Sequence, residues 1–256
     1  MVTPDWYPDE VAHAGDEHLE PDYVLNYDRK AGFVDPTADL DVLSRFGLDG
    51  TQTVVDLGAG TGVFAMAVAP RCRRVVAVDV SAPMLRSLEG EAERRGITNI
   101  EPVQAGFLTY QHTGDPPDVV FSRNALHHLP DFWKALALSR IALMLRPGGI
   151  LRLHDLVYDF DPADVGAAIE PWLAGAAPTP QVGWTRAEYE THLREEHSTF
   201  TWLLEPMLER IGFTIRDRTI SPNGIYASYT CARTGQGNDR DVSRWSSGMI
   251  VAADKP

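Results

Sequence analysis

The chain is poor in cysteine, in basic residues and in long apolar runs. Its two cysteines, Cys72 and Cys231, suit a reduced compartment and predict neither a disulfide framework nor a cysteine metal cluster. The 36 Asp and Glu outnumber the 23 Lys and Arg, for a formal net charge of -13. This balance disfavours nucleic acid as the main partner, because phosphate binding needs clustered basic residues. No apolar run is long enough to cross a bilayer, and the first residues lack the order of a signal peptide. We therefore expect a cytoplasmic protein without membrane insertion.

The most informative stretch is a glycine-rich turn behind an apolar strand. Residues 53–57 read Thr-Val-Val-Asp-Leu, a run typical of a strand buried on both faces. Gly58, Gly60 and Gly62 follow, and a helix-like apolar run covers residues 63–69. Strand, glycine turn and helix together form a cradle for nucleotides. The spacing lacks the last glycine of a dinucleotide fingerprint, and no Gly-Lys-Ser/Thr follows, which excludes a phosphate P-loop.

The run from Asp56 to Gly62 resembles the first motif of class I S-adenosylmethionine (SAM) dependent methyltransferases. Asp79 ends the second predicted strand about 20 residues beyond the turn, where an acid accepts both hydroxyls of a ribose. The alternative is that Asp79 caps the next helix, although Ser81 already suits that position. The resemblance implies SAM as the cofactor and S-adenosylhomocysteine (SAH) as the product. It assigns cofactor contacts to Asp56, Gly58, Ala59, Gly60, Gly62, Asp79, Val80, Met84, Gly106, Phe107, Arg123 and Asn124.

The third predicted strand, 100–104, is followed by a departure from the family pattern. Family members often carry an acidic residue there, which bonds the adenine amino group. This chain has Ala105-Gly106-Phe107 instead. Two interpretations stay open: Phe107 packs on the adenine ring, or backbone groups bind its edge.

The segment from Arg123 to Asp131, Arg-Asn-Ala-Leu-His-His-Leu-Pro-Asp, follows the fourth predicted strand. It resembles the corresponding segment of methyltransferases of the ubiquinone and menaquinone biosynthesis type, and it marks the family rather than the substrate. A fifth strand is predicted at 150–156, and a hairpin of two strands at 213–220 and 225–231. The resemblance implies an α/β fold: a Rossmann-like, seven-stranded, mostly parallel sheet with an antiparallel C-terminal hairpin and a helical insertion after the fifth strand.

We divide the chain into an N-terminal arm, 1–35, a methyltransferase domain, 36–233, and a tail, 234–256. The arm is acidic yet contains aromatic residues, and we predict that it closes over the cofactor as a lid, with Tyr27 as its contact. A solvated, loosely ordered arm is the alternative. The tail has few apolar residues and no periodicity, so we predict disorder there.

Residues 157–203 form the predicted insertion, which mixes aromatic and polar side chains. Its position after the fifth strand places it over the carboxyl end of the sheet, where ligands of open α/β sheets bind. We predict that it covers the acceptor, and that the substrate contacts are His128, Trp184, His197 and Trp202.

Methyl transfer from SAM requires the protein mainly to position the acceptor and to exclude water. An oxygen or nitrogen acceptor that keeps its proton also needs a base, and histidine suits this role with an unperturbed pKa near ~6.5. We predict His154 first and His127 second, although such residues also brace loops and proximity alone can suffice. We expect no metal, because catechol-type members hold magnesium with several acids and only Asp155 follows the strands here.

The sequence thus predicts a methyltransferase that acts on an O, N, C or S atom of a small metabolite by in-line displacement. The alternatives are a methyltransferase of a protein or RNA, and a SAM-binding protein of this fold with another role. The insertion contains three tryptophans, which suit an enclosed, partly aromatic pocket for a small substrate.

Overall fold

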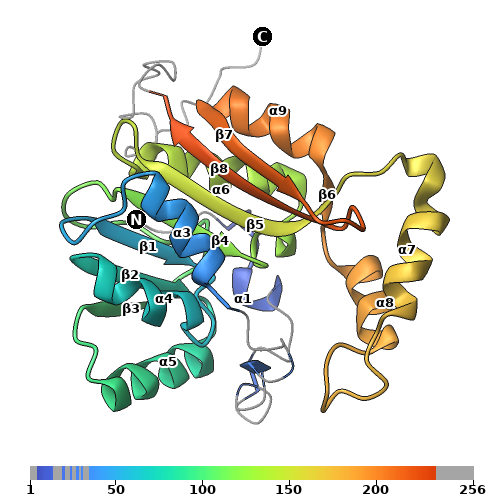
Figure 1. Cartoon of the computed structure of the whole chain (residues 1–256), viewed down its shortest axis with the longest axis horizontal. Helices are drawn as coiled ribbons and strands as arrows, with labels where there is room; N and C mark the ends of the chain where they lie inside the picture. The colour runs from blue at the N-terminus through green and yellow to red at the C-terminus, as the bar shows by residue number, and fades with distance from the viewer. Residues whose placement is uncertain are drawn as a thin grey trace.

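A single mixed sheet organises the residues that the computed structural model describes, which are 5–13, 19–20, 24, 27–28, 30 and 35–234. The strands run in the order β3-β2-β1-β4-β5-β8-β7 (Figure 1). The parallel strands are β1 (Thr53–Leu57), β2 (Arg74–Asp79), β3 (Ile100–Gln104), β4 (Val119–Arg123) and β5 (Ile150–Tyr158). Two antiparallel strands, β8 (Tyr226–Arg233) and β7 (Phe213–Ile220), complete the edge beside β5. The predicted Rossmann-like sheet with a C-terminal hairpin is confirmed.

One short strand is absent from the sequence prediction. β6 (Thr199–Phe200) pairs in parallel with the end of β5, at Val157 and Tyr158. It has this partner because β5 runs two residues beyond its predicted end. The pairing ties the far end of the insertion to the sheet.

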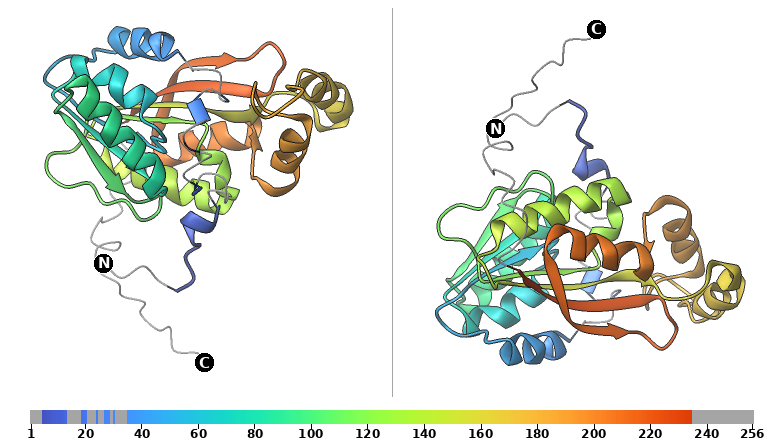
Figure 2. Two further views of the ribbon diagram at one scale, coloured as in Figure 1. Left: turned by 90° about the horizontal axis from the view of Figure 1, so that it is seen from below. Right: turned by 90° about the horizontal axis from the view of Figure 1, so that it is seen from above.

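Helices cover both faces of the sheet, as the two views of Figure 2 show. The helices α3 (Thr37–Arg45), α4 (Val63–Val68) and α5 (Ala82–Arg95) pack on one face. The helices α6 (Asp131–Met144) and α9 (Thr201–Ile211) pack on the other. The strands alternate accordingly: Val54 joins the first core, and Val55 the second. The carboxyl ends of β1 to β5 therefore meet at one edge of a rigid layer.

Local signals set several helix ends. The Ser81 hydroxyl accepts from the N–H of Met84 at 3.2 Å and caps α5, which ends at the left-handed Gly96. Helix α8 (Arg186–Glu195) begins with the predicted capping box of Thr185 and Glu188.

The segment after β5 leaves the sheet and returns. A short 3-10 turn, η4 (Pro162–Asp164), leads into α7 (Val165–Ala174), and α8 follows. Both helices project beyond the end of the sheet at the right of Figure 1. Their apolar side chains form a cluster of their own with the end of β5, which includes Leu156, Trp172 and Ile225.

Smaller elements complete the described part of the chain. These are α1 (Glu10–His13), η2 (Ala69–Arg71) and η3 (Leu126–His128). Within the part of the chain that the structure describes, none of the helices combines the length and the apolar character that crossing a membrane requires. The disordered tail is predicted for 234–256, of which residues 235–256 lie outside the described residues, as does much of the arm.

Candidate active site

The glycine turn after β1 is hydrogen-bonded to β2, and one of its glycines faces open space. The N–H groups of Gly58 and Ala59 donate to a β2 carbonyl at 2.9 and 3.0 Å. Gly60 has a φ of +54°, and a Cβ built there meets nothing within 4 Å. A Cβ built at Gly62 would lie 2.6 Å from Leu88. Gly62 is thus a packing requirement, whereas Gly60 borders a space that a ligand can fill.

Two acids flank this space. Asp79 accepts from the N–H of Gly60 and from the N–H of Ser81, both at 2.8 Å. Burial raises the pKa of Asp79. Asp56 on β1 is buried with its Oδ2 lacking a hydrogen-bond partner, and burial with the charge of Asp79 raises its pKa to about 8. The Asp79 carboxylate keeps acceptor capacity beyond its two backbone bonds, as ribose hydroxyls require.

A cavity extends from the turn to the segment after β3. Its lining includes most of the predicted cofactor residues: Tyr27, Gly58, Gly60, Asp79, Val80, Met84, Gly106, Phe107, Arg123 and Asn124. Asp56 and Ala59 line a second, adjoining cavity. Gly62 lines neither of these two cavities, so its predicted direct contact with the cofactor stays a prediction.

Asn124 supplies an unsatisfied polar atom to both cavities. Its φ of +49° lies in the left-handed region, which asparagine tolerates better than most residues. Its N–H donates to the carbonyl of His154 at 2.8 Å, and its Oδ1 is buried without a hydrogen-bond partner. Its neighbour Arg123 is oriented by Asp39, with Nη2 2.5 Å from Oδ2. A buried acceptor without a donor indicates a place for a ligand N–H group.

The second cavity lies between the sheet and the insertion. Aromatic side chains of the insertion and of β8 line it, among them Trp172, Trp184, Tyr189 and Tyr226. Trp172 stacks on Tyr189 with ring centroids 4.3 Å apart, and Trp184 meets the edge of Tyr27 at 6.5 Å. These rings give one wall of the cavity a flat, apolar character.

The end of the N-terminal arm connects the glycine turn with the insertion. Lys30 is buried, pairs with Glu188 and lies with Nζ 4.4 Å from the ring centroid of Trp184. Asp28 accepts from the hydroxyl of Thr61 at 2.5 Å. The arm therefore contacts the second cavity on two sides, at Thr61 of the glycine turn and at Glu188 of the insertion.

His154 lines the second cavity from the interior of β5. Its Nδ1 lies 2.6 Å from the hydroxyl oxygen of Ser228, and its ring stacks on Tyr226. Burial, with the charge of Arg123, lowers the pKa of His154 to about 4. The imidazole is therefore neutral at neutral pH.

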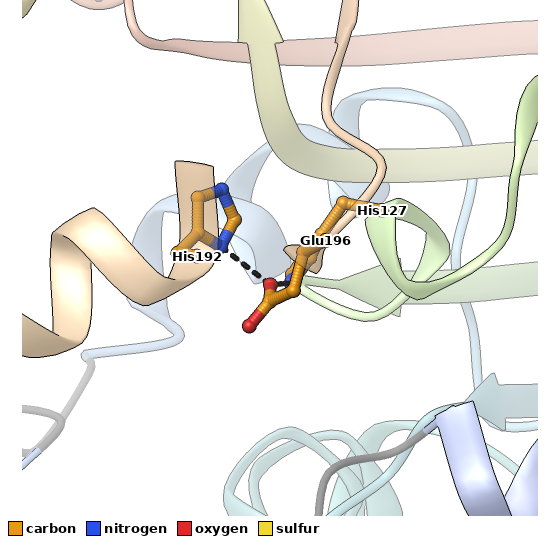
Figure 3. A group of neighbouring side chains, drawn as sticks. All are labelled: His127, His192 and Glu196. Atoms are coloured by element: carbon orange, nitrogen blue, oxygen red, sulfur yellow. Dashed lines mark ion pairs between the residues drawn. The ribbon is translucent and has the colours of Figure 1, made fainter. Parts of the chain in front are cut away.

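His127 has a different environment, with a carboxylate on each side. Its Nδ1 lies 2.5 Å from Asp155, and its Nε2 lies 2.9 Å from Glu196 of the insertion. Burial opposes the charge, but the two carboxylates outweigh it and raise the pKa of His127 to about 9. Glu196 also pairs with His192 (Figure 3). The Nε2 of His192 lies 2.8 Å from the Ser198 hydroxyl. His127 is thus a cation at neutral pH, which weakens its predicted role as a base.

The same group has the composition of a transition-metal site. His127, His192 and Glu196 offer ligand atoms within 4.8 Å of one another. Two imidazoles and one carboxylate are a donor set that divalent transition metals accept. The three side chains are already joined by two ion pairs, so a metal ion would have to displace these contacts and their protons.

Two predicted substrate residues lie away from the two cavities, whereas His128 and Trp184 line the second one. Trp202 is 56% exposed, because α9 begins at Thr201 and turns the indole outward onto Phe200. His197 lines neither cavity; its backbone carbonyl accepts from Lys134 and its N–H donates to the His127 carbonyl. The predicted substrate contacts of Trp202 and His197 therefore have no support from the linings of these two cavities.

Sequence reasoning missed three residues that the fold brings to the site. His192 in the last turn of α8 and Glu196 directly after the helix have the i,i+4 spacing that brings side chains together, which was the available signal. Glu10 of the arm lines the first cavity, which extends from the glycine turn to the segment after β3. Nothing in the sequence around Glu10 indicates this position.

Comparison with known proteins agrees with the fold. Residues 54–149 match a family model described as a methyltransferase domain. The chain is similar to trans-aconitate 2-methyltransferase from Azoarcus sp., 34% identical over 166 residues, which are 60% of this chain and 62% of that protein. It is also similar to a cypemycin N-terminal methyltransferase from Streptomyces sp., 41% identical over 128 residues, 48% of this chain and 50% of that one. A solved SAM-dependent methyltransferase from Aquifex aeolicus shares the fold, with a TM-score of 0.56 at 18% identity over 84% of this chain and 99% of that one.

The chain is similar to SAM-dependent methyltransferases, and the family model matches it over residues 54–149, less than half of its length. The matches do not single out the ubiquinone and menaquinone type among them. The aligned regions span 62% and 50% of the two curated relatives' lengths. SAM, the cofactor that the resemblance implies, fits the observed cradle, because Gly60 borders open space and Asp56 and Asn124 each have a buried oxygen without a hydrogen-bond partner.

Proposed function

We propose that the protein transfers the methyl group of SAM to an O, N, C or S atom of a small metabolite. One observation carries the proposal. The cavity between the glycine turn and the segment after β3, here the cofactor cavity, shares a wall with the second cavity between the sheet and the insertion, here the aromatic cavity. Residues common to both linings are Tyr27, Gly58, Gly60, Arg123, Asn124 and His128. A donor in one cavity and an acceptor in the other would face each other across this wall, as an in-line displacement needs.

Different residues of the chain bind the ribose and the amino-acid end of the cofactor. Asp79 accepts the ribose hydroxyls, and Gly60 leaves room for the backbone to approach. Asn124 and Asp56 accept N–H groups at the amino-acid end, where each has an unsatisfied buried oxygen. When bound, SAM supplies a methyl group that its sulfonium has already activated.

Residues of the insertion and of the described part of the arm line the cavity proposed for the acceptor. Trp172, Trp184 and Tyr226 provide flat apolar surface, and Lys30 holds the arm against Trp184 and Glu188. This concave, aromatic lining favours a small acceptor with a ring or another planar apolar part over a folded macromolecule.

His154 is the preferred base where the acceptor must lose a proton. It is neutral at neutral pH, lines the aromatic cavity and has Nδ1 fixed by Ser228, which leaves Nε2 as the atom for proton transfer. His127 instead braces the insertion. The transfer itself needs no metal, since the leaving group is a neutral thioether.

The names of the two relatives indicate different acceptors, trans-aconitate and an N-terminus. The aromatic lining supports neither in particular. The alternative of a macromolecular acceptor predicts label in protein or RNA rather than in a small molecule.

Calorimetry with SAH tests the cofactor site, and transfer of a labelled methyl group from SAM to size-fractionated extract tests the acceptor class. Asp79→Ala should weaken SAH binding by about ten- to a hundredfold, since it removes charge-assisted hydrogen bonds. Gly60→Val should weaken it further, because the side chain would enter the cradle. Asp115→Ala, the same change at an exposed position, should bind SAH as the wild type does. Absence of SAH binding in the wild type, or label confined to macromolecules, would contradict the proposal.

A further inference from the structure

The cofactor cavity has a carboxylate at the end of β3 although the sequence there has none. The segment after β3 is Ala105-Gly106-Phe107, and all three residues line the cavity. Glu10 lines the same cavity, and its side chain comes from α1 of the N-terminal arm. The carboxylate that the family places after this strand is thus supplied from another part of the chain.

The Glu10 carboxylate lies where an aspartate at position 106 would put its own. A Cβ built on Gly106 would lie 2.3 Å from Oε1, 2.4 Å from Cδ and 2.6 Å from Oε2 of Glu10. One C–C bond of about 1.5 Å separates the Cβ of an aspartate from its carboxyl carbon. An aspartate at 106 would therefore overlap with the Glu10 carboxylate, and glycine at 106 is what makes room for Glu10.

Glu10 also makes the hydrogen bonds that such an aspartate would make. Its Oε1 accepts from the N–H of Leu108 at 3.0 Å, and its Oε2 accepts from the hydroxyl of Thr109 at 2.9 Å. An aspartate that opens a turn characteristically accepts from groups two and three residues further on. Glu10 replaces it in both position and bonding.

The arm segment that carries Glu10 is packed against the domain. Trp6 stacks on Trp133 of α6 with ring centroids 5.8 Å apart, and Tyr7 lies 5.3 Å from the same ring. Asp9 accepts from the N–H of Val11 at 3.0 Å and caps α1. Glu10 itself is only 9% exposed. Its carboxylate therefore has a fixed place in the cavity wall.

We infer that Glu10 is the adenine-recognition residue of this chain and accepts a hydrogen bond from the 6-amino group of the purine. The inference rests on the proposed function. With Asp79 on the ribose, the base extends toward β3, the strand beside β2. An ionised carboxylate has about four acceptor sites. Leu108 and Thr109 use two of them, which leaves capacity for an amino donor. A 6-oxo purine would instead place its oxygen against an acceptor-only group.

The test compares three ligands by calorimetry: SAH, its 6-oxo analogue S-inosylhomocysteine, and the analogue that has hydrogen in place of the amino group. The wild type should bind SAH more tightly than either analogue. Glu10→Ala should weaken SAH binding by about ten- to a hundredfold and leave the deamino analogue nearly unchanged, so the preference for the amino group disappears.

A rescue variant separates recognition from folding. Gly106 has an ordinary backbone conformation, so an aspartate fits there once Glu10 is removed. The double variant Glu10→Ala, Gly106→Asp should regain most of the preference for the amino group. Gly106→Asp alone should bind SAH more weakly than the wild type, because two carboxylates compete for one volume. Val11→Ala, an exposed neighbour on α1, is the control.

The outcomes distinguish the two proposals. If the wild type does not bind SAH, the proposed function fails. If it binds SAH but Glu10→Ala weakens all three ligands equally, or the double variant regains nothing, Glu10 is a docking residue of the arm and the inference is wrong.

Discussion

The Nδ1 atom of His127 lies 2.5 Å from Oδ1 of Asp155, where the ends of β4 and β5 meet. The remaining oxygen of Asp155 accepts from the N–H groups of Leu126 and His127, at 2.8 and 3.2 Å. The other ring nitrogen of His127 faces Glu196 of the insertion. His127 therefore connects Asp155 of β5 with Glu196 of the insertion, which lines the second cavity.

The first prediction concerns stability against pH. The folded pKa of His127 is raised to about 9, so its contribution to stability is complete below its unfolded pKa near ~6.5 and is lost as the pH rises through about 9. Glu196→Gln should lower the folded pKa and remove roughly 1–3 kcal/mol of the stability present at pH 6.5. Urea unfolding at pH 6.5 and at pH 9.5 measures the difference. Glu195→Gln, the same change at the adjacent exposed position, should keep the wild-type pH dependence; equal effects of both variants would contradict the assignment.

The second prediction concerns His154 as the base. His154→Ala should lower kcat by ~10²–10⁴ where the acceptor must lose a proton, and should barely change SAH affinity. The acidic limb of the wild-type pH profile should lie near pH 4, because burial lowers the pKa of His154 to about that value. An unperturbed histidine would place the limb near ~6.5. His112→Ala, remote from both cavities, serves as the control. A variant with wild-type turnover and pH profile would show that His154 is structural.

The third prediction concerns metal. Because His127, His192 and Glu196 are engaged in ion pairs with one another, we expect turnover to survive dialysis against a chelator. Elemental analysis of the purified protein should find no stoichiometric zinc, iron or manganese. One equivalent of metal that is retained by the wild type and lost in His192→Ala would overturn this expectation.

Local chemistry explains which parts of the fold the sequence predicts. The β-branched run before Gly58, the serine cap of α5 and the box of Thr185 and Glu188 each act within a few residues, and the structure has all of them. The order of the strands came from the resemblance to a known family. Residues whose interactions lie within a few positions in the sequence could thus be predicted together with the residues that they contact.

Long-range contacts explain what the sequence could not predict. Glu10 reaches Leu108, and Glu196 reaches His127, only because the sheet and the insertion bring distant segments together. Trp202 was assigned to the pocket from its composition alone. The orientation of the Trp202 side chain depends on the residue at which α9 begins. The spacing of apolar residues in the sequence does not determine that first residue to within one position.

The last prediction tests the arm as a lid. Lys30 is buried between Glu188 and the Trp184 ring, so it anchors the arm to the insertion beside the second cavity, which we propose holds the acceptor. Deleting residues 1–30 should leave a folded core that binds SAH more weakly, because both this anchor and Glu10 are lost. Lys30→Ala removes the anchor and keeps Glu10. It should therefore raise KM for the acceptor several-fold, while the preference for SAH over its deamino analogue stays as in the wild type. Lys30→Arg should restore most of the acceptor affinity, since its guanidinium also pairs with a carboxylate and stacks on an aromatic ring. Steady-state kinetics and calorimetry on these variants, with Arg94→Ala as an exposed control, measure both effects. If the truncated chain and Lys30→Ala both keep wild-type turnover, KM and SAH affinity, the arm does not close over the site.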